Sequence, residues 1–347
     1  MRACSRGTVR AAFVAFGVLT AISNRSHAQV AYDSPSGRVE VLGLRRWTLK
    51  MLQDSVRHYV PGQELHEAAC MVTLRDSLGF ADASVARFEW TPPGQPLRSF
   101  LTIKVVEPAQ ASQVQWDVRA RSEFTSLLPD YAPLILPVTD ARGDVLSGRI
   151  DNWLQFSDSG RRELALANAP SGARADADRV VEFRRSQRSE PSRQRAMRVL
   201  ASDGFWVNRM AAVVVLSNFA QHNSTWRALV RALRDPNEGV REAARTVIGT
   251  FPPRPVDWRA SSKDLRLLVG GTNLPAMGDL FSVLASTSIS HDMAASILRD
   301  NGDWVLDHLA SETPMASQAA HQLLVRLNAG RDLGRSREAW SIWIRSL

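Results

Sequence analysis

The chain has 347 residues and a formal net charge of +8. This length is ample for a buried core and predicts two domains or more. Two cysteines are too few for a disulfide scaffold, and only three of the 43 basic residues are lysines, an arginine skew that does not by itself indicate nucleic-acid binding.

The first 28 residues predict a secretory signal peptide. Three arginines within the first ten residues precede an apolar run over 11–22, and residues 26–28 read Ser-His-Ala, a small-x-small cleavage pattern. The run is shorter than the ~20 residues that span a bilayer, although an uncleaved anchor is the alternative. We therefore expect cleavage after Ala28, a periplasmic or secreted protein, and no transmembrane segment in the mature chain.

Cleavage would remove four arginines and one cysteine. The formal net charge would fall from +8 to +4, and Cys70 would be the remaining thiol. One thiol cannot form an internal disulfide, so the fold must rest on its hydrophobic core. Cys70 falls in a predicted helix, where a buried structural thiol is favoured over a nucleophile.

Residues 38–107 predict the order strand, helix, helix, strand, strand. Apolar residues alternate with polar ones at Val39 and Val41, and Thr48 is a candidate N-cap for the first helix. Pro61-Gly62 ends that helix, and a second helix is expected from about residue 64 to 78. Its expected buried side consists of Leu65, Ala68, Ala69, Val72 and Leu78. Strands follow over 85–90 and 101–105.

This order resembles a POTRA domain, here over 38–108. The features that carry the resemblance are Val39-Glu40-Val41-Leu42-Gly43, Pro61-Gly62, Leu78-Gly79-Phe80 and Ile103-Lys104-Val105-Val106-Glu107. The resemblance implies protein–protein contact, often by addition of a partner strand to an exposed sheet edge. An unrelated α/β sandwich with the same element order is the alternative.

Residues 109–178 are expected to connect two domains. Val114, Trp116 and Val118 alternate and could form a further strand. A helix is predicted by the spacing of Leu146, Ile150, Trp153 and Leu154. The stretch 157–178 is rich in Ser, Gly, Ala and charged residues, which indicates a flexible linker or long loop.

A basic stretch over 179–198 follows the expected linker. It contains seven arginines and two glutamates; the arginines are Arg179, Arg184, Arg185, Arg188, Arg193, Arg195 and Arg198. We favour a solvated face of the first helices of the next domain, because charge runs usually face solvent. The alternative is a patch that contacts anionic lipid head groups or an acidic partner.

The helical pattern over 195–251 occurs twice, 32 residues apart. The residues that recur are Arg195, Ala196, Asp203, Arg209, Ala211, Ala212, Val215 and Phe219, which reappear as Arg227, Ala228, Asp235, Arg241, Ala243, Ala244, Val247 and Phe251. A unit of this length is one helical hairpin that must stack on neighbours. The alanine spacing returns at Ala319, Ala320 and Leu323.

This repeat resembles HEAT repeats, with the turn and second helix over 235–244 as its best example. We therefore expect a multidomain α+β then all-α chain, with a HEAT-like α-solenoid over 179–347. The resemblance implies a hydrogen-bonded ladder between layers, with structural roles for Asp203, Arg209, Asp235 and Arg241. Trp340 and Trp343 would cover the last layer, because terminal repeats need a cap.

The sequence contains no catalytic motif that we could assign. His66-Glu67 begins a zinc-protease pattern, but Cys70 stands where the second histidine should be. Asp307-His308 is a common dyad sequence without an accompanying nucleophile motif. We therefore predict no catalytic residue, no cofactor and no metal.

Together these features predict an exported, non-catalytic scaffold or adaptor in the cell envelope. It would bind another envelope protein, and no nucleic acid, through the solenoid surface or the sheet edge. One alternative is an enzyme with a site between the domains that uses His66, Glu67 or Asp307-His308. The other alternative is a peripheral binder of anionic lipid through residues 179–198.

Overall fold

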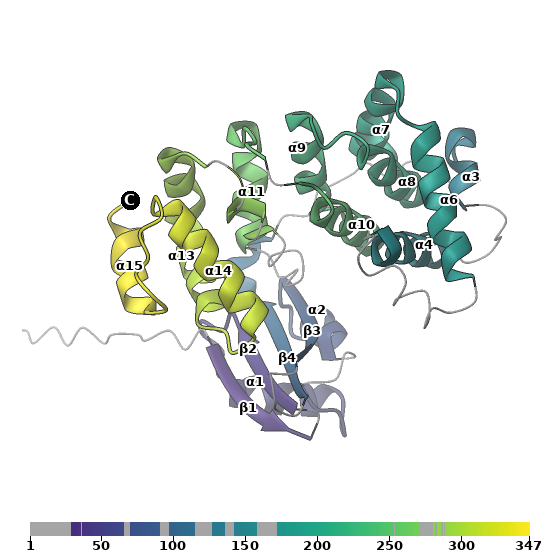
Figure 1. The fold of residues 1–347 in the computed structure, drawn as a ribbon. Helices are drawn as coiled ribbons and strands as arrows, with labels where there is room; N and C mark the ends of the chain where they lie inside the picture. Colours follow the sequence, from purple (N-terminus) through teal and green to yellow (C-terminus); the bar gives the residue numbers. More distant parts are fainter. Residues whose placement is uncertain are drawn as a thin grey trace, which may run out of the picture.

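A computed structural model describes a small sheet with two helices, followed by a mostly helical region (Figure 1). The described residues are 29–35, 37–65, 70–90, 97–114, 127–135, 142–157, 172–252, 254–270, 280–281, 283–285, 287 and 289–347. The expected sequence of α+β structure followed by all-α structure is therefore present.

The sheet has four strands in the order β1-β2-β4-β3. Their bounds are β1 Gln29–Ser34, β2 Gly37–Leu42, β3 Asp82–Trp90 and β4 Arg98–Val106. β2 and β4 are parallel, and the two outer pairs are antiparallel. β2, α1, α2, β3 and β4 follow the element order that we expected over 38–107.

Strand β1 was not expected from the sequence. It forms a hairpin with β2, in which Gly37 adopts a φ of 116° and the Ser34 hydroxyl donates to the Gly37 carbonyl at 2.9 Å. The six residues of β1 include few large apolar side chains, so their sequence pattern does not predict a strand. The strand is recognised by its pairing with β2.

One face of the sheet packs against helices α1 (Leu49–Tyr59) and α2 (Cys70–Asp76). Side chains alternate along a strand, so Val39, Val41 and Ile103 enter this core while Glu40, Thr102 and Lys104 lie on the opposite face. Thr48 caps α1, because its hydroxyl accepts the Met51 N–H at 3.2 Å.

Helix α2 differs from the expected helix over 64–78. It ends at Asp76, and Glu64 and Leu65 lie outside it, while residues 66–69 are not among the described residues. Val72 is 51% exposed rather than buried, because Met71 and Leu74 form the face that packs on the sheet.

The helical region forms a curved row above the sheet, from α6 and α7 at one end to α15 at the other (Figure 1). The long helices are α4 Arg142–Ser157, α6 Ala173–Ser186, α7 Glu190–Ser202, α8 Trp206–Leu216, α9 Asn223–Ala232, α10 Glu238–Gly249, α11 Ser262–Gly270, α13 His291–Leu309, α14 Pro314–Leu327 and α15 Arg337–Arg345. The short elements are η1 Pro108–Gln113, η2 Pro129–Tyr131, α3 Ala132–Ile135 and η3 Arg259–Ser261.

Helices α7 to α10 stack as two hairpins, with α7 beside α9 and α8 beside α10. Ala211, Ala212, Ala243 and Ala244 of α8 and α10 are buried. Small residues at such positions let helix backbones approach closely, which explains why the repeat preserves them. Edge-to-face rings of Trp226, Phe251 and Trp258 continue the core toward α11, with centroid separations of 4.9 and 6.1 Å from Trp226.

Part of the expected connecting segment belongs to this helical region. Helix α4 packs against α6, α8 and α10, and its predicted face, with Leu146, Ile150 and Trp153, lies in the same core. Arg149 fixes α4, since it donates to the Asp176 carboxylate at 3.0 Å and to the Ile135 carbonyl at 2.9 Å.

The prediction of a flexible linker or long loop over 157–178 is wrong for its last residues, because residues 173–178 form the first turns of α6. Their buried alanines, Ala173 and Ala177, pack into the core and make the segment helical. Residues 158–171 lie outside the described part of the chain. So do 115–126, which include most of the strand expected around Trp116.

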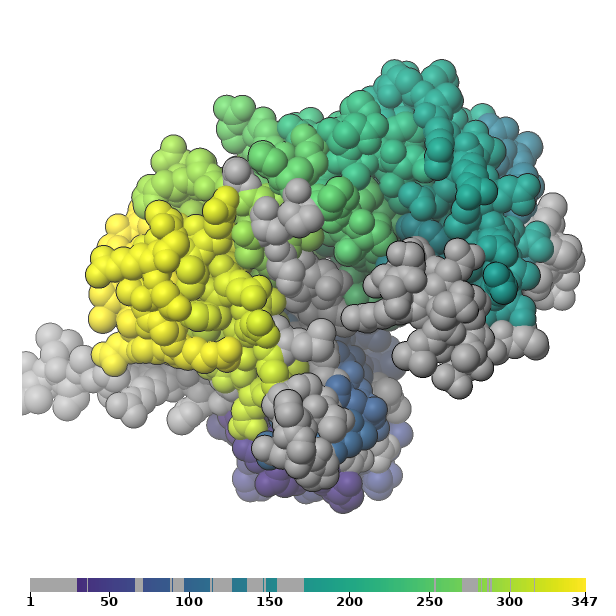
Figure 2. Space-filling view, viewed as in Figure 1, coloured from purple at the N-terminus to yellow at the C-terminus, as the bar shows by residue number. Residues whose placement is uncertain are grey.

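The space-filling view shows the helices as one continuous mass, with the C-terminal helices directly over the sheet (Figure 2). At the end of the row, Trp340 is completely buried and donates its indole N–H to the Gly334 carbonyl at 2.7 Å. Its ring lies 5.4 Å from that of Trp343, edge to face.

Candidate functional site at the junction of sheet and helices

The second face of the sheet is covered by α13 and the turn that follows it. Ser311 donates its hydroxyl to Glu40 at 2.6 Å, and the Glu312 N–H donates to the same carboxylate at 2.9 Å. The Thr102 and Thr313 hydroxyls are 2.9 Å apart. Glu40 and Thr102 point away from the core that the sheet forms with α1 and α2. They therefore contact residues more than 200 positions later in the sequence.

Lys104 lies at the centre of this junction and has no exposed surface. Its Nζ is 3.3 Å from His308 Nε2 and 4.8 Å from the centroid of the Trp304 ring. The Arg45 guanidinium lies 4.9 Å from the same ring, so Trp304 contacts two cationic groups. Such cation–π contacts compensate part of the lost hydration of the two groups.

Burial lowers the pKa of Lys104 to about 7, with nearby Arg45 adding to the effect and Asp307 opposing it. Burial also lowers the pKa of His308 well below its ordinary value, and Lys104 lowers it further. Burial therefore shifts both groups toward their neutral forms, relative to an exposed lysine or histidine.

Asp307 does not pair with the adjacent His308, as the dyad sequence suggested. Its carboxylate accepts from Arg45 Nη2 at 2.9 Å and lies 2.8 Å from Arg337 Nη1, while His308 contacts Lys104. Consecutive helix residues point in different directions, so neighbours in sequence need not share a site. Asp307 thereby joins α13 to α15 and to the segment between β2 and α1.

Glu107 holds that segment in place. Its buried carboxylate accepts the backbone N–H groups of Arg45, Arg46 and Trp47 at 2.6 to 3.0 Å. A carboxylate that accepts several N–H groups orders a loop strongly, because each bond is charge-assisted. This places Arg45 where it reaches Asp307.

The junction is arranged to hold two parts of the molecule together. Lys104 is inaccessible and His308 is 2% exposed, so neither presents a surface to a reactant in this arrangement. His66 and Glu67 are outside the described residues. Among the residues that the structure describes, no group of three His, Cys, Asp or Glu side chains could hold a metal ion.

Asp203 and Asp235 of the expected ladder lie at the turns between α7 and α8 and between α9 and α10, and Arg209 and Arg241 lie near the starts of α8 and α10. Arg209 donates to both oxygens of Asp235, at 2.8 and 2.7 Å, and both side chains are buried. Arg209 Nη1 also donates to the Asp203 and Gly204 carbonyls, and Arg241 donates equivalently to the Asp235 and Pro236 carbonyls. The pair Arg209–Asp235 thus joins one hairpin to the next.

The 32-residue spacing does not repeat this pair at Asp203 or at Arg241. By the 32-residue spacing, Asp203 would need an arginine at position 177 and Arg241 an aspartate at position 267, where the chain has Ala177 and Leu267. The Asp203 carboxylate instead accepts the Phe205 N–H at 2.7 Å and the Asn208 amide at 3.1 Å. The two copies of the repeat are therefore joined by one arginine–aspartate pair at this spacing, Arg209–Asp235.

The seven arginines of the basic stretch do not form one continuous surface. Arg184 packs on Trp153 and donates to the Ser217 carbonyl, Arg193 pairs with Glu190, and Arg195 pairs with Asp130. The exposed members are Arg185, Arg188 and Arg198. Packing against neighbouring helices thus uses part of the charge.

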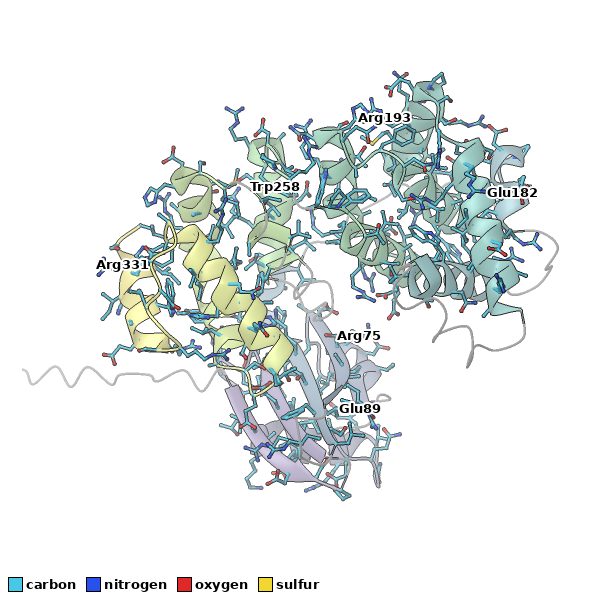
Figure 3. All side chains as sticks on the ribbon, viewed as in Figure 1. Arg75, Glu89, Glu182, Arg193, Trp258 and Arg331 are labelled. Atoms are coloured by element: carbon cyan, nitrogen blue, oxygen red, sulfur yellow. The ribbon has the colours of Figure 1, made fainter. Side chains whose placement is uncertain are left out.

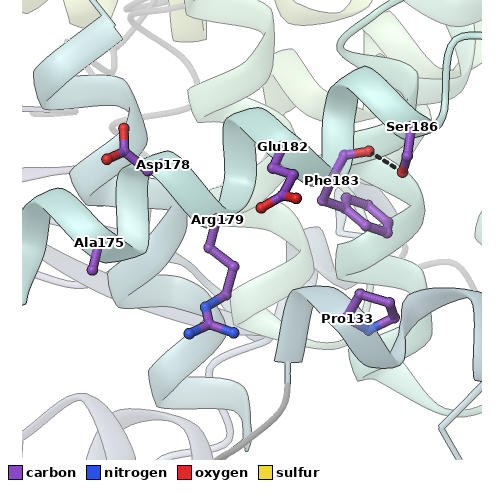
Figure 4. Close-up of a pocket in the computed structure, with 7 residues that line it drawn as sticks. All are labelled: Pro133, Ala175, Asp178, Arg179, Glu182, Phe183 and Ser186. Atoms are coloured by element: carbon purple, nitrogen blue, oxygen red, sulfur yellow. Dashed lines mark hydrogen bonds between the residues drawn. The ribbon is translucent and has the colours of Figure 1, made fainter.

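Arg179 lies in a hollow of about 950 Å³ beside α6. Asp178, Glu182 and Phe183 of the same helix also line it, with Pro133 of α3 opposite (Figure 4). The mixture of one arginine and two carboxylates makes this hollow an unsuitable site for a simple anion.

A smaller groove crosses α7, α9 and η3 and has a volume of about 270 Å³. No sequence pattern predicts this groove, because its lining comes from four elements, α7, α9, η3 and α11. The lining residues are Met197, Leu200, Ala201, Ser224, Arg227, Ala228, Arg231, Ala232, Ala260, Ser261 and Asp264. Figure 3 labels Arg193 of α7 and Trp258, which directly precedes η3.

None of the described helices is long and apolar enough to cross a membrane; residues 1–28 are outside that description. No family model, no curated protein and no solved structure matches the chain.

Proposed function

We propose that this protein is a non-catalytic adaptor that binds another protein through the surface of its helical row. We propose further that residues 179–347 form a HEAT-like array and 38–108 a POTRA-like domain, and that residues 1–28 direct the chain to the envelope. The HEAT-like array is supported by the 32-residue repeat, its buried alanines and the Arg209–Asp235 pair.

One observation carries the adaptor proposal. The polar groups that could have served chemistry are turned inward and hold the molecule together, as at Lys104, His308 and Asp307. The outer helices α7 and α9, in contrast, line a groove, with Ala201 of α7 exposed beside it. Stacked helical repeats use such extended surfaces to bind partners.

The sheet edge is the second candidate surface. Among the described strands, β3 pairs with β4 and β1 pairs with β2, so each outer strand has one edge without a described strand beside it. Peptides can add to such edges through backbone hydrogen bonds. The sheet face opposite α1 and α2 is covered by α13 and the turn that follows it.

Site-specific photo-cross-linking in intact cells tests the proposal. A photoreactive residue replaces Arg231 on α9, Glu89 on β3 or Arg331 near the C-terminus, all exposed positions (Figure 3 labels Glu89 and Arg331). We expect one discrete adduct from position 231 and none from position 331. An adduct from position 89 alone would show that the partner binds at the sheet edge. The absence of any adduct would reject the adaptor function.

A further inference from the structure

The sheet and the helical row have separate hydrophobic cores among the described residues. Val41 and Ile103 belong to the core that the sheet forms with α1 and α2, whereas Val106, at the end of β4, belongs to the core of the helices. The sheet face that meets α13 carries Thr102 and Lys104 instead. Two parts of a chain that join through a polar interface can separate while each keeps most of its own core.

Hydrogen bonds hold this junction together. Glu40 of β2 accepts from the Ser311 hydroxyl at 2.6 Å and from the next backbone N–H at 2.9 Å. The Thr102 and Thr313 hydroxyls are 2.9 Å apart. Water can replace each of these bonds when the two surfaces separate, so each of them adds little net free energy to the closed arrangement.

The contact between Lys104 and His308 makes the junction sensitive to protons. The two nitrogens lie 3.3 Å apart, and both side chains are buried. An ammonium group and an imidazolium ring are both donors only, so a hydrogen bond between them requires that at least one of the two nitrogens be unprotonated. Two positive charges at this separation, away from water, would also repel one another strongly. The closed junction therefore excludes the doubly protonated pair.

The carboxylates that act on Lys104 do not remove this restriction. Asp307 of α13 attracts Lys104, but its carboxylate also accepts from Arg45 at 2.9 Å and lies 2.8 Å from Arg337. Asp82 of β3 attracts Lys104 as well, while Arg45 repels it. Burial lowers the pKa of Lys104 to about 7 in spite of both carboxylates.

Two further carboxylates of the junction bind other groups. Glu40 of β2 accepts from the turn after α13, and Glu312 of that turn pairs with Arg38 at 2.8 Å. Burial and the neighbouring Lys104 hold the pKa of His308 well below its ordinary value. Protonation of His308 is therefore opposed in the closed junction and becomes favourable once the ring reaches water.

We propose that the junction between the sheet and α13 is an acid-sensitive clasp, which opens when Lys104 and His308 are both protonated, while the sheet and the helical row each stay folded. In the open state both side chains reach water, and both can carry their charge. Acidification favours this state because it binds more protons than the closed one. The clasp does not depend on the adaptor function.

Thiol labelling tests the clasp in the full chain, with Cys4 and Cys70 replaced by serine. T102C places a thiol in the junction, V41C places one in the core of the sheet, and A244C places one in the core of the helices; all three positions are buried. The reagent is dithiodipyridine. Each rate is divided by the rate of the same variant unfolded in urea at the same pH, which removes the effect of pH on the thiol itself.

The expected result is local opening at acidic pH. T102C should label at least about tenfold faster at about pH 5.5 than at about pH 8, because the open state gains protons over this range. At about pH 5.5 it should also label at least about tenfold faster than V41C and A244C, since local opening leaves both cores closed.

Variants assign the pH dependence to the buried pair. K104M/H308L replaces both groups with apolar side chains, so T102C labelling in this background should be nearly independent of pH. K50M/H58L changes the same residue types at exposed positions of α1, and this matched control should keep the wild-type rise. H308Q keeps a polar side chain that does not titrate, so it should lose most of the rise below about pH 6.5. This single variant decides the question if the double variant does not fold.

Three results would overturn the proposal. The first is T102C labelling that does not rise as the pH falls. The second is equal labelling of T102C, V41C and A244C at acidic pH, which would mean that the junction opens only when the whole protein unfolds. The third is the wild-type rise in H308Q or in folded K104M/H308L, which would show that other groups control the opening.

Discussion

Asp203 and Asp235 occupy the same position in the two copies of the repeat, and each carboxylate accepts the backbone N–H two residues later, but their side-chain partners differ. Asp235 is completely buried and receives two hydrogen bonds from Arg209. Asp203 is half-buried and accepts from the Phe205 N–H and the Asn208 amide at the start of the next helix. The difference arises because Arg209 has an aspartate in the following hairpin, whereas position 177 in the preceding helix is alanine.

This difference leads to a matched pair of substitutions. D235A leaves the buried Arg209 guanidinium without its partner and should lower the free energy of unfolding by about 3–5 kcal/mol. D203A removes interactions at a helix start and should cost about 0.5–2 kcal/mol. Urea denaturation followed by circular dichroism measures both. Equal losses in the two variants would show that the inter-layer pair contributes nothing beyond a cap.

At the scale of elements, the turn between β2 and α1 brings the sheet and α13 together. Gly43 has a φ of 94°, and a Cβ placed there would meet the Val105 carbonyl oxygen at 2.1 Å and the Trp304 ring at 2.9 Å. Glycine is therefore required both by the backbone conformation and by the close approach of β4 and α13. Glu107 then orders the residues that follow, through Arg45 to Trp47.

Gly62 provides a control for Gly43. It has a similar φ of 86°, but a Cβ there would meet nothing within 4 Å. G62A should cost about 1–2 kcal/mol of unfolding free energy, the usual penalty of a left-handed residue. G43A should cost clearly more, and its Trp304 fluorescence environment should change because the junction must open. Similar melting temperatures for the two variants would contradict this reading of the junction.

In the molecule as a whole, a largely buried cluster of ionisable side chains joins the N-terminal sheet to the C-terminal helices. Replacement of buried charges by apolar groups is often neutral or stabilising, so the cluster fixes an arrangement more than it adds stability. Its members come from β4, the β2–α1 segment, α13 and α15, as Lys104, Arg45, Asp307 with His308, and Arg337.

The cluster predicts that unfolding free energy depends on pH. The pKa of Lys104 is about 7 in the folded protein and 10.5 ordinarily, so the unfolded state binds more protons between these values. Stability should therefore fall as pH decreases from about 10.5 to about 7, by at most ~1.4 kcal/mol per unit from this group. His308 extends the loss below 6.5, because its pKa is lowered in the folded state.

The variant K104M isolates the lysine contribution. It should unfold with much less pH dependence between about 7 and 10.5 and should be at least as stable as the wild type near pH 7. Urea titrations near the two ends of this window measure the slope. The same slope in K104M and in the wild type would show that Lys104 is not buried as described.

The local features of this protein could be predicted from its amino-acid sequence. The Thr48 cap, the α4 face, the alternation in β2 and β4 and the 32-residue repeat all depend on residues within one turn, one strand or one hairpin. Such short-range patterns are visible because side-chain direction follows from secondary structure. They also indicated that α/β structure precedes helical structure.

The contacts between distant parts of the chain, in contrast, depend on how whole elements pack in three dimensions. The sequence marks Lys104 simply as a polar residue that points away from the sheet core, and α13, 204 residues later, converts that position into a buried site. Tertiary packing likewise gives Asp307 and His308 different partners, leaves Val72 exposed and assembles the groove from α7, α9, η3 and α11. Contacts between distant residues leave no periodic trace in the sequence, because each depends on how whole elements pack.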